Sequence, residues 1–148
     1  MPKVTNKTAQ EKAEAILFDT HAAIWLAQGN PKIRKSLPAL QSAHEAKSLF
    51  ISAISAWEIG MLVNKGRLVL PQSPMMWFNE LTANFNLQVL NVDAQVAVQS
   101  SFLPGVFHGD PADRMIVATA QKYNLILLTA DKAIITYSKS GVIKVHGL

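Results

Sequence analysis

Cysteine is absent from the chain, which excludes disulfide bonds, thiolate metal sites and a cysteine nucleophile. Long apolar runs are also lacking, because no stretch approaches the roughly 18 residues of a membrane-spanning helix. The N-terminal residues lack the apolar core of a secretory signal. These absences predict a protein without a membrane partner, and the missing cysteines fit a cytoplasmic location.

Charge is scarce in this sequence. Charged residues make up 16% of the chain and hydrophobic residues 49%, which is typical of a globular protein rather than a disordered one. Fourteen Lys and Arg face ten Asp and Glu, so the net charge is +4, and the basic residues form no dense block. This mild excess is compatible with a nucleic-acid partner but does not by itself indicate one.

Short apolar segments alternate with helical patterns over residues 15–148, which follow a polar lead-in at residues 1–14. Strands are expected at 15–18, 49–52, 87–92, 125–128 and 142–145. Helices are expected at 20–28, 32–47, 52–65, 73–85, 93–102, 110–123 and 131–137, with Pro38 kinking or splitting the second. This alternation predicts one α/β domain with three layers, α/β/α, around a mostly parallel sheet of four to five short strands.

Two aspartates follow predicted strands. Asp19 comes directly after the 15–18 strand, and Asp131 comes shortly after the 125–128 strand. Either could be a simple helix cap. Because ligands of parallel sheets bind at the carboxyl ends of the strands, we expect both side chains at one candidate site.

Two further acids lie on apolar helix faces. Ile54, Met61 and Leu62 fall within about 60° of Glu58 on its helix, which predicts that Glu58 points into the core. Asp113 points inward from the first turn of its own helix by the same reasoning. A buried carboxylate must be paired, protonated or bound to metal, and a structural pair with Arg or Lys is the alternative to a functional role.

The stretch His108-Gly-Asp110-Pro-Ala-Asp113 places Asp110 directly before its helix, where capping explains it well, and Pro111 at the first helical position. Capping explains Asp113 poorly. Carboxylates gathered at one sheet edge repel one another unless a cation lies among them, and oxygen ligands without cysteine suit Mg²⁺ or Mn²⁺. Such sites typically serve phosphoryl chemistry.

Four segments resemble the PIN-domain family, and within it the VapC-type ribonuclease toxins of toxin–antitoxin pairs. The segments are Leu17-Phe-Asp19-Thr20-His21, Ser52-Ala-Ile-Ser-Ala-Trp57-Glu58-Ile59, His108-Gly-Asp110-Pro-Ala-Asp113-Arg114 and Leu127-Leu-Thr129-Ala-Asp131. Their order and spacing fit the family from about Ala15 to the C-terminus. The residues before Ala15 depart from the pattern, because these toxins usually begin close to the first strand.

The resemblance implies a PIN-like fold and an endoribonuclease that depends on Mg²⁺ or Mn²⁺. It implies that Asp19, Glu58, Asp113 and Asp131 are the catalytic, metal-binding acids, with Asp110 as a further candidate ligand. Thr20, Thr129 and Arg114 are expected to support the site, Arg114 through an ion pair or a contact with a partner subunit. The expected reaction is in-line attack of metal-held water on an RNA phosphodiester, leaving 5′-phosphate and 3′-hydroxyl ends.

The implied partners are an RNA of the tRNA or rRNA class and a cognate antitoxin protein. The resemblance also implies a homodimer, assembled with antitoxin into a heterotetramer or a larger complex. Two alternatives stay open at this point: a catalytically inactive module on the same fold that binds RNA or protein, and a phosphatase that uses Asp19 as nucleophile. The three tryptophans, Trp25, Trp57 and Trp77, are expected to pack in the core or at a subunit interface rather than to stack on bases.

Overall fold

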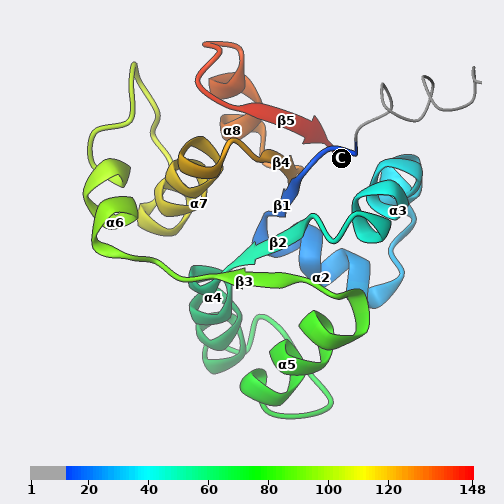
Figure 1. The fold of residues 1–148 in the computed structure, drawn as a ribbon. Coiled ribbons are helices and arrows are strands. Elements are labelled where there is room, and N and C mark those ends of the chain that lie inside the picture. The colour runs from blue at the N-terminus through cyan, green and yellow to red at the C-terminus, as the bar shows by residue number, and fades with distance from the viewer. Residues whose placement is uncertain (1–12) are drawn as a thin grey trace, which may run out of the picture.

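A five-stranded sheet lies between two layers of helices (Figure 1) in the computed structural model, which describes residues 13–148. The strands are β1 (Ile16–Phe18), β2 (Leu49–Ser52), β3 (Gln88–Leu90), β4 (Ile126–Thr129) and β5 (Lys144–Gly147). The helices are α2 (Thr20–Gln28), the 3-10 helix η1 (Pro31–Ser36), α3 (Leu37–Glu45), α4 (Ala53–Asn64), α5 (Pro74–Phe85), α6 (Ala94–Ser100), α7 (Pro111–Tyr123) and α8 (Lys132–Ser138). The predicted α/β/α fold is confirmed, and the predicted lead-in falls largely outside the described residues.

The strand order β3-β2-β1-β4-β5 creates a switch point beside β1. All four strand pairings are parallel, with Phe18 of β1 paired to Ile51 of β2 and to Leu128 of β4. The chain builds the sheet outward from β1 to β3 and then returns to add β4 and β5 on the other side. In open parallel sheets the crevice at such a reversal, outside the carboxyl ends of the strands, is the usual ligand site.

Alternate strand residues build two separate cores. Ile16 and Phe18 of β1 face the layer of α2, α3 and α5, whereas Leu17 faces the layer of α6, α7 and α8. All three side chains are fully buried. Because successive strand side chains point to opposite faces, a fully apolar strand is what a sheet covered on both faces requires. This sandwich holds the carboxyl end of β1 in place.

Two element boundaries are informative. The predicted split at Pro38 is confirmed, because η1 ends at Ser36 and Pro38 lies in the first turn of α3, where its missing N–H costs no helical hydrogen bond. The last strand begins at Lys144 rather than at the predicted Val142, since the side chain of Ile143 enters the core before the backbone pairs with β4. No helix within residues 13–148 is long and apolar enough to cross a membrane.

Candidate active site

Three carboxylates meet above the carboxyl end of β1. Asp19 follows β1 directly, Glu58 projects from α4, and Asp113 projects from the first turn of α7. One oxygen from each of these carboxylates lies within 4.8 Å of the others. The three residues are far apart in sequence, so the fold rather than a local motif brings them together.

Asp19 is held by hydrogen bonds to both of its carboxylate oxygens. The Thr129 hydroxyl donates to Oδ2 at 2.6 Å, and the backbone N–H of Thr20 donates to Oδ1 at 2.8 Å. The Thr129 hydroxyl in turn accepts the backbone N–H of Asp131 at 3.0 Å. The two groups that donate to Asp19 come from residues at the ends of β1 and β4. The junction of these two strands therefore fixes the orientation of the Asp19 carboxylate.

Glu58 is positioned by a second buried hydroxyl. The Thr20 Oγ1 donates to Glu58 Oε1 at 2.6 Å and lies 2.8 Å from the hydroxyl oxygen of Ser55. Thr20 and Ser55 are both fully buried. Since buried polar groups need partners, this network fixes the rotamer of the Glu58 side chain.

Asp113 is placed by the start of α7. Asp110 is the N-cap, and its Oδ1 accepts the Asp113 backbone N–H at 2.8 Å. Gly109 precedes the cap where the Phe107 ring comes so close that a Cβ on Gly109 would lie 2.3 Å from the Phe107 Cζ. The missing side chain of Gly109 therefore lets the turn pass over the ring and set the direction of α7.

The three carboxylates open onto a cavity of about 310 Å³. Its lining residues are Asp19, His21, Trp25, Glu58, Asp110, Asp113, Ala130 and Asp131. Five of these eight residues are acidic, and they come from the ends of β1 and β4 and from α4 and α7. His21 and Trp25 share one face of α2, because they are four residues apart.

Burial and mutual repulsion both act on these acids. Burial raises the pKa of the Asp113 carboxyl to about 7, with the charges of Asp110, Asp19, Glu58 and Asp131 adding to the effect. Burial also raises the pKa of Asp19 and of Glu58, and the threonine hydrogen bonds only partly oppose this. The cluster therefore resists full ionisation at neutral pH unless positive charge enters it.

The donor set of this cluster fits a hard divalent cation. Within residues 13–148 the ion pairs are Lys122 with Asp93 and His146 with Glu14, so Asp19, Glu58 and Asp113 have no Lys or Arg partner there. The converging atoms are all carboxylate oxygens. Oxygen ligands of this kind suit Mg²⁺ or Mn²⁺, and Asp19, Glu58 and Asp113 are the residues that would hold such an ion.

Residues 16–139 match the sequence model of the PIN-domain family. This chain belongs to the PIN-domain family. It is 33% identical to Ribonuclease VapC22 of Mycobacterium tuberculosis over 117 residues, which cover 79% of this chain and 87% of that protein. The predicted resemblance to the PIN family and to VapC-type proteins is therefore confirmed.

Solved structures share the fold of this PIN domain. A toxin–antitoxin complex from Klebsiella pneumoniae aligns with a TM-score of 0.58 at 22% identity, over 90% of this chain and 99% of that chain. VapBC2 from Rickettsia felis, bound to a DNA fragment from its promoter, aligns with a TM-score of 0.64 at 16% identity, over 89% of this chain and 97% of that chain.

Three of the four predicted metal-binding acids of the PIN domain converge in the structure, and the fourth lies beside them. Asp131 borders the cavity, but its Oδ1 accepts the backbone N–H groups of Ala133 and Ile134 and so caps α8. Asp110 also borders the cavity, from its position as the exposed N-cap of α7. Metal-binding roles for Asp131 and Asp110 stay predictions.

Two expectations for individual side chains need correction. Glu58 does not point into the core, because Ser55 and Ile59 are the buried residues of α4, and Glu58 is half-buried at the cavity. The expected ion pair of Arg114 is not found within the part of the chain that the structure describes. Its guanidinium instead donates to the carbonyl oxygens of Ser100 at 2.7 Å and Phe107 at 2.5 Å. Arg114 thus supports the site by tying the 101–107 loop to α7.

The structure adds to the expectation for Trp25 and narrows the expectation for Trp57. Trp25 lines the acidic cavity while also packing against the core, and its four-residue spacing from His21 beside Asp19 could have indicated this. Trp57 is 56% exposed and therefore does not pack in the core. Packing of Trp57 at a subunit interface stays a prediction.

Proposed function

We propose that this PIN-domain protein is an endoribonuclease that depends on Mg²⁺ or Mn²⁺ and is the toxin of a toxin–antitoxin pair. The observation that carries the proposal is the convergence of Asp19, Glu58 and Asp113, whose carboxylate oxygens lie within 4.8 Å of one another. The family match and the similarity to Ribonuclease VapC22 support the same activity.

The residues of the site are arranged to hold negative charge in a fixed place. Thr129 and Thr20 keep the carboxylates of Asp19 and Glu58 oriented before any ligand arrives. When bound, divalent cations supply orientation of water and stabilisation of charge on a phosphate. The cavity beyond the carboxylates is large enough to admit a phosphodiester and its attacking water, and it opens at the sheet edge where α/β proteins bind ligands.

We propose that Asp110 and Asp131 act from the rim of this cavity. Each has one oxygen committed to capping, Asp110 for α7 and Asp131 for α8. The second oxygen of each has no hydrogen-bond partner among the described residues, which leaves it for a second cation or for a water molecule.

The phosphatase alternative loses support from the state of Asp19. Thr129 and the Thr20 N–H fix its carboxylate as one of three converging acids, an arrangement that suits a metal ligand better than a covalent nucleophile. The inactive-module alternative is weakened by the intact acid cluster, since a polyanion-binding protein gains nothing from converging carboxylates.

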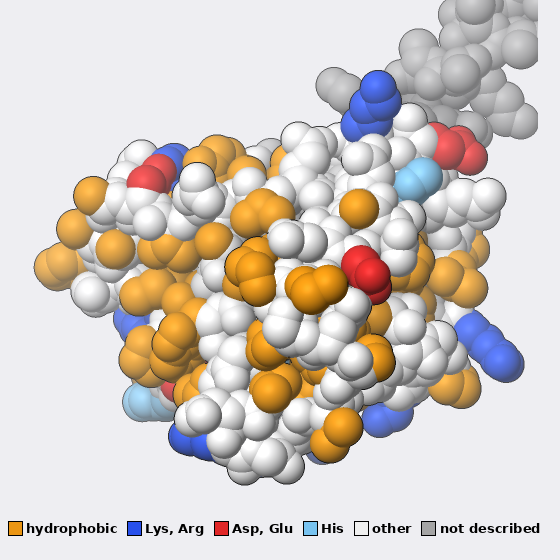
Figure 2. Space-filling model, turned by 90° about the horizontal axis from the view of Figure 1, so that it is seen from below, with side chains coloured by type: hydrophobic (Ala, Val, Ile, Leu, Met, Phe, Trp, Pro, Cys, Tyr) orange, Lys and Arg blue, Asp and Glu red, His pale blue; other side chains and the backbone are white. Residues whose placement is uncertain are grey.

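An exposed apolar face supports the proposed protein partners. Hydrophobic side chains gather on the face at the bottom of Figure 1, over α4 and α5, with few charged groups among them (Figure 2). Trp57 of α4 and Met75 and Met76 of α5 are more than half exposed. Large exposed apolar residues mark interaction surfaces, so we propose a homodimer that binds its antitoxin as a heterotetramer or larger assembly. We place this assembly in the cytoplasm, with tRNA or rRNA as the substrate class.

The decisive experiment is cleavage of labelled total RNA by the purified, antitoxin-free protein with Mg²⁺ or Mn²⁺. We expect discrete products that disappear in EDTA and in Asp113→Asn. Asp93→Asn is the control, because Asp93 is an acid at the start of a helix, α6, but pairs with Lys122 outside the cavity. Equal activity of the wild type and Asp113→Asn, or cleavage that persists in EDTA, would refute a metal-dependent mechanism at this site.

A further inference from the structure

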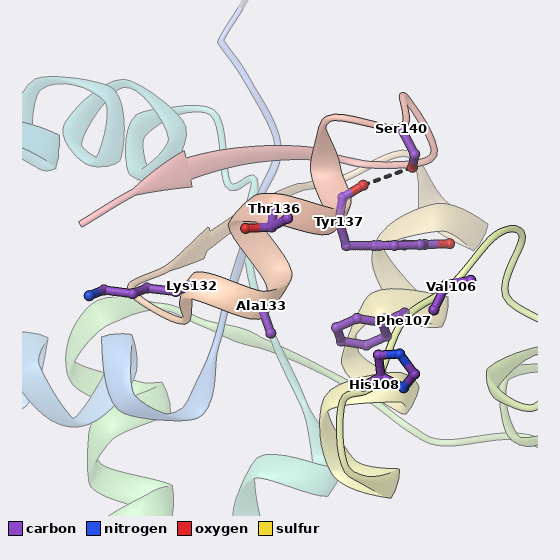
Figure 3. Close-up of a pocket in the computed structure, with 8 residues that line it drawn as sticks. All are labelled: Val106, Phe107, His108, Lys132, Ala133, Thr136, Tyr137 and Ser140. Carbon is purple, nitrogen blue, oxygen red and sulfur yellow. Dashed lines mark hydrogen bonds between the residues drawn. The ribbon is translucent and has the colours of Figure 1, made fainter.

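A second concave surface lies beside the acidic cavity. It encloses about 420 Å³ between α8 and the segment that leads into α7 (Figure 3), and we call it the α8 pocket. Its lining residues are Val106, Phe107, His108, Lys132, Ala133, Thr136, Tyr137 and Ser140. The volume lies within the range of about 300–1,000 Å³ that is typical of small-ligand sites.

The floor of the α8 pocket is aromatic and rigid. The Phe107 and Tyr137 rings pack with centroids 4.9 Å apart. The Tyr137 hydroxyl donates to the Pro104 carbonyl at 2.6 Å, and the Arg114 guanidinium holds the Phe107 carbonyl. Phe107 is 7% exposed and Tyr137 is 5% exposed, so only the ring edges reach the pocket, where they form a preformed apolar surface.

Charge at the α8 pocket favours an anionic ligand. Its eight lining residues include one cation, Lys132, and no Asp or Glu. Figure 3 shows the Lys132 side chain extending away from the two rings, so apolar floor and cation are spatially separate. A nucleotide has this same division, with a flat base at one end and a phosphate at the other.

The α8 pocket adjoins the acidic cavity through two segments of the chain. Asp131 lines the cavity and Lys132 lines the pocket, so one peptide bond separates the two sites on α8. On the other side, His108 lines the pocket and Asp110 the cavity, with Gly109 between them. A strand of RNA with a phosphate at the carboxylates would have its next nucleotide beside the α8 pocket.

We propose that the α8 pocket receives an unpaired nucleobase next to the scissile phosphate, with Lys132 facing the phosphate of that nucleotide. This inference rests on the proposed ribonuclease function and adds a determinant of where the RNA is cut. A base can enter only if it is unstacked, so the substrate is single-stranded at this position. The bases next to the cut are then selected by their fit to the Phe107 and Tyr137 floor.

The test blocks the α8 pocket with a tryptophan side chain placed at an exposed position on its rim. Ala133 is exposed on α8, so Ala133→Trp blocks the pocket without entering the core, and Thr136→Trp repeats the test one turn further on. Gln41→Trp is the matched control at an exposed position of α3, away from the acidic cavity, the α8 pocket and the apolar face over α4 and α5. All three changes are combined with Asp113→Asn to prevent cleavage, and binding of fluorescent single-stranded hexaribonucleotides is measured by anisotropy in Mg²⁺.

We expect Ala133→Trp and Thr136→Trp to weaken binding about tenfold, the effect of losing one base contact, whereas Gln41→Trp binds as the parent does. An abasic hexamer of equal charge should bind all four proteins equally. In the cleaving background, the pocket variants should lose base preference next to the cut. Unchanged hexamer affinity, or equal losses with the abasic hexamer, would overturn the proposal. Cleavage by the wild type tests the ribonuclease function separately.

Discussion

Replacing Asp113 by asparagine is expected to stabilise the metal-free protein at pH 8 and to change its stability little at pH 4. The pKa of Asp113 is raised from 3.8 to about 7, first by burial and then by the neighbouring carboxylates. An acid with a raised pKa in the folded state binds its proton more tightly there than in the unfolded chain. Folding stability therefore falls as pH rises from about 4 to about 7, and it stays low above that range.

The size of this effect follows from the two pKa values. The gap between 3.8 and about 7 corresponds to about 4 kcal/mol at full strength. Asp113 is only half-buried, so solvent screening reduces the penalty to about 1–2 kcal/mol. Asparagine removes the charge and also loses a favourable interaction with the N-terminus of α7, which is worth about 0.5 kcal/mol. A net gain of about 1 kcal/mol is expected at pH 8.

The assay is urea unfolding followed by circular dichroism, in EDTA, at pH 4 and pH 8. Asp93→Asn is the control, because Lys122 holds the pKa of Asp93 below its ordinary value, and the loss of this pair should not stabilise the protein. Saturating Mg²⁺ should reverse the order at pH 8, raising the stability of the wild type by about 2–3 kcal/mol at a hundredfold excess over Kd. A variant that is less stable than the wild type in EDTA at pH 8 would refute the reasoning and make Asp113 part of a structural network.

Two other substitutions test the parts that position the acids. Thr129→Val removes the hydroxyl that donates to Asp19. We expect it to lower the free energy of unfolding in urea by about 1–3 kcal/mol and the rate of RNA cleavage at least tenfold. Full activity would show that Asp19 needs no such donor. Gly109→Ala should cost about 1–3 kcal/mol, because the new methyl group collides with the Phe107 ring. Gly60→Ala, with open space around its Cβ in α4, should instead stabilise the protein by about 0.5–1 kcal/mol, and similar effects from both alanines would contradict the close approach at Gly109.

The fold and most of the acid cluster could be predicted because their signals are local. Apolar runs such as 15–18 and 125–128 predict strands buried on both faces, and a parallel sheet gathers the residues that follow them at one edge. Asp19 and Asp131 could be singled out in this way, and Asp113 by the apolar residues on its face of the helix. The alternation of strands and helices was enough to predict that these aspartates lie at the same end of the sheet.

The remaining features depend on contacts between distant segments. The α4 sequence is apolar on nearly every side, so its periodicity did not show that Ser55 and Ile59 face the core while Glu58 faces the cavity. The hydroxyl of Thr129 reaches Asp19 across 110 residues. The α8 pocket combines the 106–108 segment with α8, and neither segment alone has the pattern of a ligand site.

The choice of neutral donors explains how this site stays available to a cation. Lys or Arg beside Asp19 and Glu58 would lower their pKa values and stabilise the fold, but each would also neutralise the charge that attracts a metal ion. Thr20 and Thr129 fix the same oxygens through hydroxyl groups and leave the negative charge in place. The cluster therefore keeps its carboxylates oriented at some cost in stability, and a bound cation would offset that cost.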